Sequence, residues 1–323
     1  MESPADFSRG LRLEAPARLH MGFLDLDGSL GRQFGSLGVG LEGLSTCLSL
    51  RPSDDLIVEG PEAERALSSL HRLGEALGRR FTGHLTLSSC VPSHAGLGSG
   101  TQMALAVGIA MSRLHGLSLT AGEVAHLSGR GRRSGIGIAT FEAPGLVVDA
   151  GRGPKTEVPP VIARLALPSD WRFLILRDPI TQGLHGRAEV EAFAALPPFP
   201  RAVAADLCHR VLMQALPALM DQDLDRFGEA IEALQRAVGD HFAPRQGGRF
   251  TSPTVAKTLE WAGNLGARAR GQSSWGPTGF CLMPSPEAAE QLILQLRRDC
   301  AAAKGLLIDL AAPARQGARL TPL

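Results

Sequence analysis

Apolar and polar positions recur along the chain with two different periods, and these divide it into predicted strands and helices. Alternation with a period of two predicts strands at residues 11–18, 47–50 and 85–90. Apolar residues at helical spacing predict helices at residues 61–80 and 103–114. Further patterns predict strands at 56–58, 145–149, 171–176 and 306–310, and helices at 120–128, 203–219, 224–238, 254–262 and 285–300. Strands and helices mixed without regular βαβ repetition indicate an α+β fold.

A stretch rich in glycine and proline, at residues 151–160, separates the two halves of the chain. Such composition is typical of a domain boundary. A chain of 323 residues is long enough for two domains. We therefore expect one domain at residues 1–160 and a second at residues 161–323.

Composition narrows the classes of partner. The formal net charge is +1, so the chain has no basic field for nucleic acid or an anionic membrane. Its five cysteines are scattered without a CxxC pair, which favours a reducing compartment. Residues 1–10 lack the apolar segment of a signal peptide, and the most apolar window is far shorter than the ~20 residues that span a bilayer. We expect a cytoplasmic protein that binds neither nucleic acid nor membrane.

The main chemical signal is a glycine loop, VPSHAGLGSGT at residues 91–101, between a predicted strand and a predicted helix. Glycines let the backbone approach a ligand closely, and the N–H groups at a helix start attract anions. The loop therefore predicts phosphate binding. His94 within it could contact the ligand or simply face solvent. We assign phosphate or pyrophosphate binding to Gly96, Leu97, Gly98, Ser99, Gly100 and Thr101.

Several common phosphate and catalytic motifs are absent from the sequence. The loop has no lysine, so it is not a GxxxxGK[ST] nucleotide loop. No GxGxxG opens a first βα unit with an acidic residue about 20 positions later, which argues against a dinucleotide site. No HExxH or Cys/His cluster suggests zinc, and Ser99 does not stand in a GxSxG elbow.

A second candidate is the segment GRGRRSGIG at residues 129–137. Arginine offers paired donors that match phosphate oxygens, and the flanking glycines give access. We therefore assign Arg130, Arg132, Arg133 and Ser134 to a phosphate clamp. The alternative is a solvated basic turn.

A third candidate lies near the N-terminus, where Arg18, His20 and Asp25 stand among apolar neighbours before a glycine-dense tract at residues 28–43. One interpretation is a buried ion pair followed by hairpin turns. The other is a contact with an anion or hydroxyl group at a strand end, because a buried arginine near a carboxylate is often functional.

Two motifs together resemble those of the GHMP kinase superfamily. Residues 92–101 are similar to its PxxxGLGSSAA motif, and residues 271–278, GQSSWGPT, are similar to its C-terminal glycine-rich motif. The resemblance implies an N-terminal ribosomal-protein-like α/β domain, a C-terminal ferredoxin-like domain and a site between them. It also implies substrate binding by Gly271, Gln272, Ser273, Ser274, Trp275 and Gly276. Trp275 could stack on a substrate ring or fill the domain junction.

The chain departs from the kinases at the position of their catalytic acid. Where they have SG-x-D, this chain has Ser134, Gly135, Ile136 and then Gly137. Loss of a general base typically slows a reaction about 10²–10⁴-fold. An ordinary kinase reaction is therefore disfavoured.

One branch of the superfamily fits these departures. Residues 17–26, 98–102, 129–137 and 271–277 resemble the β-ribofuranosylaminobenzene 5′-phosphate synthases, and the likeness covers nearly the whole chain. Such enzymes join phosphoribosyl pyrophosphate to 4-aminobenzoate or 4-hydroxybenzoate in methanopterin biosynthesis. They release carbon dioxide and pyrophosphate and form a C–C ribosyl bond.

The resemblance gives each candidate an expected role. The loop and the arginines of 130–133 would hold the phosphate groups, Arg18 would pair with the aromatic carboxylate, and His20 or Asp25 would handle a proton. Mg²⁺ is expected, although the sequence marks no ligands for it, and a homodimer is expected by analogy. Two alternatives stay open: an ATP-dependent small-molecule kinase, and a non-catalytic ligand sensor on the same fold.

Overall fold

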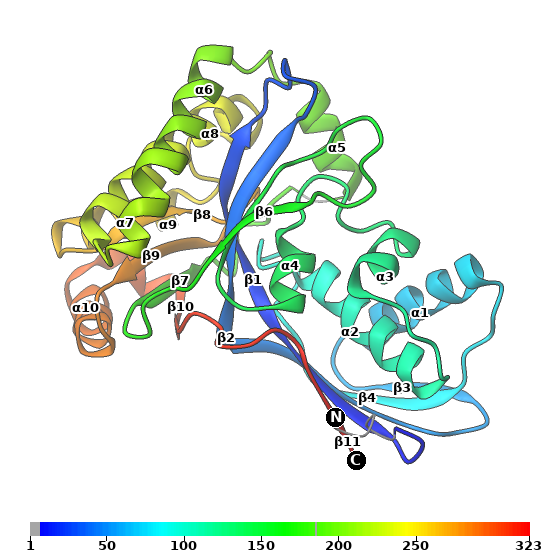
Figure 1. The fold of residues 1–323 in the computed structure, drawn as a ribbon. Coiled ribbons are helices and arrows are strands. Elements are labelled where there is room, and N and C mark those ends of the chain that lie inside the picture. The colour runs from blue at the N-terminus through cyan, green and yellow to red at the C-terminus, as the bar shows by residue number, and fades with distance from the viewer. Residues whose placement is uncertain (1–6, 185) are drawn as a thin grey trace.

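The computed structural model describes residues 7–184 and 186–323, which form two β-sheets with helices packed on them (Figure 1). The first sheet has the strand order β11-β1-β2-β4-β3, and β5 pairs with β2 and with β6. Its central strands are long and antiparallel, since β1 (Leu11–Asp25) pairs with β2 (Phe34–Arg51) along most of its length. The others are β3 (Leu56–Glu59), β4 (Gly83–Ser89), β5 (Leu146–Asp149), β6 (Val161–Leu165) and β11 (Arg319–Pro322).

Four helices belong to the same part of the molecule: α1 (Ala63–Leu77), α2 (Ser99–Leu114), α3 (Ala121–Leu127) and α4 (Ile136–Glu142). Apolar side chains of α1 and α2 share one core with those of β1, β2 and β4. The predicted capping box of α3 is confirmed, because Thr120 and Glu123 exchange hydrogen bonds. Burial of these apolar faces fixes α2, and hence the glycine loop before it, against the sheet.

The second sheet is antiparallel, with the order β10-β7-β9-β8. Its strands are β7 (Arg172–Arg177), β8 (Arg268–Gln272), β9 (Gly279–Met283) and β10 (Leu307–Ala311). The helices of this half are α5 (Gly186–Ala194), α6 (Arg201–Arg210), α7 (Leu216–Met220), α8 (Leu224–Gln246), α9 (Pro253–Asn264) and α10 (Pro286–Asp299). The expected helix at 203–219 is divided into α6, a π-helical turn at Val211–Ala215 and α7. Pro217 lacks the N–H that regular α-helical bonding would require there.

The chain crosses the expected boundary near residue 160 more than once. β6 and β11, from the second half of the sequence, complete the first sheet. One hydrophobic core also joins β1 and β2 to α6, α8 and the second sheet. The division at residue 160 stays a prediction. The geometry shows that the two halves share one packed junction.

The interpretation of the glycine-dense tract at residues 28–43 as hairpin turns is wrong for most of its length. Residues 34–43 belong to the extended strand β2. Gly38 lies under α4, where an added Cβ would stand 2.6 Å from a side-chain methyl of Ile136 and 2.3 Å from the carbonyl of Leu19. The glycine therefore allows a helix to pack closely on the strand.

Candidate functional site

The two glycine motifs, which lie far apart in the sequence, are in direct contact. The hydroxyl of Ser273 donates a hydrogen bond of 2.7 Å to the carbonyl of Gly96. An added Cβ at Gly96 would stand 2.4 Å from the Ser273 carbonyl oxygen, and one at Gly276 would stand 2.8 Å from the Cα of Gly96. Both glycines are needed because the two backbones meet with no room for a side chain.

Strand β1 supports the glycine loop from the other side. The backbone N–H of Arg18 donates to the carbonyl of Leu97 at 3.1 Å, and its guanidinium donates to the carbonyl of Gly96 at 3.1 Å. Gly96 and Gly98 have φ of 73° and 75°, which L side chains rarely adopt. The loop then enters α2, whose first N–H groups have no intrahelical partner. Exposed His94 lies in the turn just before these glycines.

Two guanidinium groups converge on the first turn of α2. An added Cβ at Gly100 would stand 3.0 Å from a nitrogen of Arg130 and 3.1 Å from a nitrogen of Arg65. Arg65 also donates to the hydroxyls of Ser93 at 2.5 Å and Ser99 at 3.3 Å. Burial, followed by repulsion from Arg72 and Arg65, lowers the pKa of Arg130. Two cations beside a positive helix end favour an anion of high charge.

Arg65 is a site residue that the sequence analysis missed. It pairs with Glu62 at 3.3 Å on α1, an element that the motif search did not consider. Its spacing from Arg72 places both arginines on the same face of the predicted helix at 61–80. That spacing was the available signal, but only the packing of α1 against α2 shows which way the face points.

The three arginines of the 129–137 segment do not act as one group. Arg130 lies beside the loop, whereas Arg132 is exposed. Arg133 forms an ion pair with Glu189 of α5, and its guanidinium lies 4.8 Å from the ring centroid of Phe193. The structure therefore brings one of the three arginines to the loop and places another against α5. Phosphate binding by Arg132 and Arg133 stays a prediction.

Ser134 is part of a buried network around Asp149. The carboxylate accepts hydrogen bonds from the hydroxyls of Ser36 at 2.6 Å and Ser134 at 3.2 Å. It also accepts from the backbone N–H groups of Gly135 at 2.9 Å and Gly151 at 2.8 Å. Burial raises the pKa of Asp149, although these bonds act in the opposite direction. The network anchors the start of α4, directly after the arginine segment.

Arg18 and His20 lie together at the junction. Burial lowers the pKa of Arg18 to about 10, and the charges of Glu189 and Asp149 oppose the shift. His20 is 1% exposed, and neither of its ring nitrogens has a hydrogen-bond partner. Burial, and then the charge of Arg18, keep the pKa of His20 well below its ordinary value. His20 is therefore a neutral group with unused hydrogen-bonding capacity.

Asp25 is not brought to the loop. It ends β1 and accepts hydrogen bonds from the N–H groups of Asp27 and Gly28, at 2.8 and 2.9 Å. It follows Arg18 by seven strand residues, about 23 Å at the usual rise. The contacts give Asp25 the role of a turn former, and proton transfer by this residue stays a prediction.

The C-terminal motif forms the wall of the junction. Trp275 is 1% exposed and stacks on Phe242, with ring centroids 3.9 Å apart. Gln272 is tied to Gln235 of α8 through its backbone, since its N–H donates to the Gln235 side chain at 2.8 Å. These contacts show that Trp275 fills the junction. Substrate contact by Gly271, Gln272, Ser273, Ser274, Trp275 and Gly276 stays a prediction.

Gly137, at the position of the kinase acid, faces the glycine loop. An added Cβ there would stand 3.1 Å from the side chain of Thr101, and Gln102 donates to the Gly137 carbonyl at 2.7 Å. A side chain at this position would require Thr101 to give way by a few tenths of an ångström. Glycine therefore suits the close packing of α4 on the start of α2.

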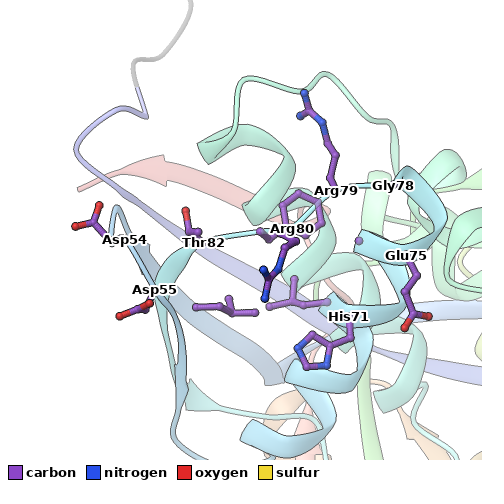
Figure 2. A pocket seen from close by; sticks show the side chains of 12 residues that line it. Asp54, Asp55, His71, Glu75, Gly78, Arg79, Arg80 and Thr82 are labelled. Atoms are coloured by element: carbon purple, nitrogen blue, oxygen red, sulfur yellow. The ribbon is translucent and has the colours of Figure 1, made fainter.

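A surface hollow of about 610 Å³ lies away from this junction, between α1 and the segment before β3. Figure 2 shows acidic Asp54 and Asp55 on one side, and His71 and Glu75 on α1 opposite them. None of the predicted site residues lines this hollow. Across residues 7–184 and 186–323, no cluster of three His, Cys, Asp or Glu side chains is arranged to hold a metal. Within the same residues, no helix is long and apolar enough to cross a bilayer.

Comparison with known proteins shows the family. The GHMP kinases N terminal domain matches residues 63–142, and the GHMP kinases C terminal domain matches residues 215–302. The "Beta-ribofuranosylphenol 5'-phosphate synthase" of Methanothermobacter thermautotrophicus is 34% identical over 84% of this chain and 88% of its own length. The protein of the same name from Archaeoglobus fulgidus is 38% identical over 70% of this chain and 75% of its own. The chain belongs to the β-ribofuranosylphenol 5′-phosphate synthase family.

The expected two-part GHMP kinase fold is confirmed. A homoserine kinase from Cytophaga hutchinsonii superposes with a TM-score of 0.65 over 99% of both chains, at 18% identity. That likeness concerns the fold alone. In this chain, the junction of the two glycine motifs is a place where the fold brings cations and buried polar groups together.

Proposed function

We propose that this synthase-family protein joins phosphoribosyl pyrophosphate to 4-hydroxybenzoate, giving β-ribofuranosylphenol 5′-phosphate, carbon dioxide and pyrophosphate. The name of its relatives specifies a phenol product, which favours 4-hydroxybenzoate over 4-aminobenzoate. The observation in the structure that carries the proposal is the convergence of Arg65 and Arg130 on the first turn of α2. This arrangement suits a leaving pyrophosphate, whose negative charge grows as the bond to ribose breaks.

The reaction balances without a net proton. The bond between ribose C1 and the pyrophosphate oxygen breaks, and its electron pair leaves with pyrophosphate. The ring carbon that bears the carboxylate then uses a π-electron pair to form the C–C bond to C1. The bond from that carbon to the carboxylate breaks next, its electrons restore the aromatic ring, and carbon dioxide departs. No kinase-type base is required, which is consistent with Gly137 at the kinase acid position.

The charged residues divide this work. Arg65, Arg130 and the first N–H groups of α2 stabilise pyrophosphate as it leaves. Arg18 contacts the glycine loop, and in this proposal it pairs with the carboxylate of the aromatic acid beside the ribose carbon. Holding both reactants in one buried junction replaces an improbable encounter in water with a fixed approach.

Mg²⁺ remains our expectation only as an ion carried by the substrate phosphates. The described residues offer no three-ligand cluster, and both oxygens of Asp149 already accept protein hydrogen bonds. Magnesium commonly binds through substrate phosphates and few protein ligands. The residues present therefore do not form a protein cage for this ion, and no step is derived through it.

The test is an incubation of the purified protein with phosphoribosyl pyrophosphate and 4-hydroxybenzoate, with Mg²⁺ and without ATP. We expect equal amounts of pyrophosphate and carbon dioxide and a product of the mass of a ribosylphenol phosphate. A parallel reaction with 4-aminobenzoate measures the preference between the two acids. No product with either acid would overturn the proposal, and turnover only with ATP would favour a kinase.

A further inference from the structure

Helix α5 places a carboxylate and an aromatic ring side by side in the junction. Glu189 forms an ion pair with Arg133, and its charge also acts on Arg18. Phe193, one turn later on the same helix, lies under the Arg133 guanidinium at 4.8 Å. A carboxylate next to a benzene ring is the chemical outline of a benzoate. One helix thus presents both groups of an aromatic acid to the same arginine.

The ring of Phe193 enters a cluster of aromatic side chains from both halves of the chain. We call Phe23, Phe34, Phe242 and Trp275 the aromatic box. The centroid of Phe193 lies 5.1 Å from that of Trp275, 5.5 Å from Phe242, 5.9 Å from Phe34 and 6.0 Å from Phe23. All four are edge contacts, a geometry that aromatic pairs prefer. The box therefore surrounds one six-membered ring, that of Phe193.

We propose that α5 occupies the binding site of the aromatic acid, with Glu189 in the place of its carboxylate and Phe193 in the place of its ring. This inference rests on the proposed function. It assigns Arg133, together with Arg18, to the acid rather than to a phosphate group. Helix α5 leaves this position when the acid binds. Arg133 can pair with either Glu189 or the carboxylate of the acid, and the aromatic box has room for either Phe193 or the ring of the acid.

The space beside the aromatic box supports a displacement rather than a free adjoining pocket. A cavity lined by His20, Phe23, Phe242 and Gln235 has a volume of about 10 Å³. That is room for about one water molecule and not for a benzene ring. On this proposal, the acid takes the place of a ring that is already present, that of Phe193 on the nine-residue helix α5.

His20 supplies the partner for the other end of the acid. Its ring lies 4.5 Å from that of Phe23, at the edge of the aromatic box, and neither nitrogen has a hydrogen-bond partner. A neutral imidazole can donate through one nitrogen and accept through the other. The para-hydroxyl group of 4-hydroxybenzoate offers both functions in return. The geometry thereby accounts for a buried histidine whose polar atoms are otherwise unused.

The decisive experiment is calorimetric titration of the full-length protein with 4-hydroxybenzoate, without phosphoribosyl pyrophosphate. In Glu189→Gln, Arg133 loses its internal carboxylate, so we expect the acid to bind about fivefold more tightly, corresponding to the loss of one competing ion pair. Phe193→Ala should also tighten binding. Glu290→Gln, an exposed change on α10, is the matched control and should leave the affinity unchanged.

The direction in which the affinity for 4-hydroxybenzoate changes decides whether α5 occupies the acid site. If Phe193 and Glu189 are fixed walls of the site, both variants will bind the acid more weakly or equally well, and the proposal is overturned. Should Phe193→Ala fail to fold, Glu189→Gln alone decides, because it preserves side-chain size. Titration with benzoate tests His20, since wild type should bind it more weakly than 4-hydroxybenzoate, and equal affinity would exclude the histidine contact.

These titrations are independent of turnover. Tighter acid binding in the variants with no ribosyl transfer would uphold the acid site and refute the proposed reaction. Transfer in wild type with no change of acid affinity in either variant would uphold the reaction and refute the role of α5.

Discussion

The junction has two sides that differ in what already fills them. We call the surroundings of Gly100, with Arg65 and Arg130, the phosphate side, and Arg133 with the aromatic box the acid side, after their proposed ligands. On the phosphate side, Arg65 and Arg130 face one point beside Gly100, and the pKa of Arg130 is lowered by burial and by the neighbouring positive charges. On the acid side, Arg133 has a carboxylate partner in Glu189, and the aromatic box holds a protein ring. On the phosphate side, the buried Nε atom of Arg130 therefore has no hydrogen-bond partner, although Arg65 is paired with Glu62. On the acid side, the charge of Arg133 is matched by Glu189, and the unpartnered polar atoms are the ring nitrogens of His20.

If the two proposals hold, this difference sets an order in which the substrates bind. A preformed cation site can accept a phosphate group with little rearrangement. A site occupied by its own helix binds its ligand more weakly, by the fraction of molecules in which the helix has left. Phosphoribosyl pyrophosphate should therefore bind readily, while the acid must displace α5.

The largest effect should come from Arg65→Ala, which removes one of the two guanidinium groups beside Gly100. Hydrogen bonds between charged groups are worth about 1.5–3 kcal/mol, so we expect the KM for phosphoribosyl pyrophosphate to rise about 10- to 100-fold. Arg65→Lys should lose less, because it keeps the charge but not the paired donors. Steady-state kinetics measure both. The control is Arg79→Ala, an exposed arginine that Figure 2 shows pointing away from His71.

An unchanged KM in Arg65→Ala would mean that Arg65 serves only its contacts with Glu62 and Ser93. Arg130 would then be the one arginine of the phosphate side that binds the substrate.

The contact between the two glycine motifs should be lost in Gly276→Ala. The new methyl group would stand 2.8 Å from the Cα of Gly96, so the two motifs must separate. Overpacking of this kind typically destabilises a protein by about 1–3 kcal/mol. Denaturant unfolding measures the change. Gly305→Ala, where an added Cβ meets no atom within 4 Å, is the control and should unfold as wild type does. Equal stability of the two variants would show that the contact of the motifs is loose.

The smallest effect concerns pH and the acid side. The pKa of His20 in the folded protein lies well below its ordinary value of 6.5, so the unfolded chain binds a proton first as pH falls. The stability that depends on neutral His20 is complete above pH 6.5 and is lost below it. The slope should approach about 1.4 kcal/mol per pH unit. Unfolding of wild type and His20→Gln at pH values from about 7.5 to about 5.5, one unit either side of that ordinary pKa, measures the slope.

The matched control is His84→Gln, which removes a half-exposed histidine paired with Glu59. It should retain the wild-type slope. A slope that persists in His20→Gln would assign the acid sensitivity to other groups.

Much of the fold and of the phosphate side could be predicted from the sequence. The glycine loop at 91–101 and the motif at 271–278 carry local signals, because backbone approach requires glycine whatever surrounds it. Gly137 likewise marked the absent kinase acid from the sequence alone, and the structure adds that this glycine packs against the side chain of Thr101. The wrong reading of residues 34–43 as turns has the opposite cause. There, glycine serves the packing of α4, which is a contact distant in sequence.

The acid side could not be predicted because its parts have no shared local pattern. The aromatic side chains come from four separate parts of the chain, namely Phe23, Phe193, Phe242 and Trp275. Taken alone, each of them looks like an ordinary core residue in the sequence. Arg133 looked equivalent to Arg130 because both stand in the same short segment. Their different directions depend on where α1 and α5 pack, which only the tertiary structure specifies. Cytoplasmic location and a homodimer stay predictions.

The most direct test of the division between the two sides is a pair of kinetic measurements on Arg130→Ala and Arg133→Ala. The KM for each substrate is determined in both variants with the other substrate saturating. We predict a crossed pattern: Arg130→Ala raises the KM for phosphoribosyl pyrophosphate, and Arg133→Ala raises the KM for 4-hydroxybenzoate. If both variants raise the KM for phosphoribosyl pyrophosphate and leave that for the acid unchanged, the two arginines form a single phosphate clamp and the division is contradicted.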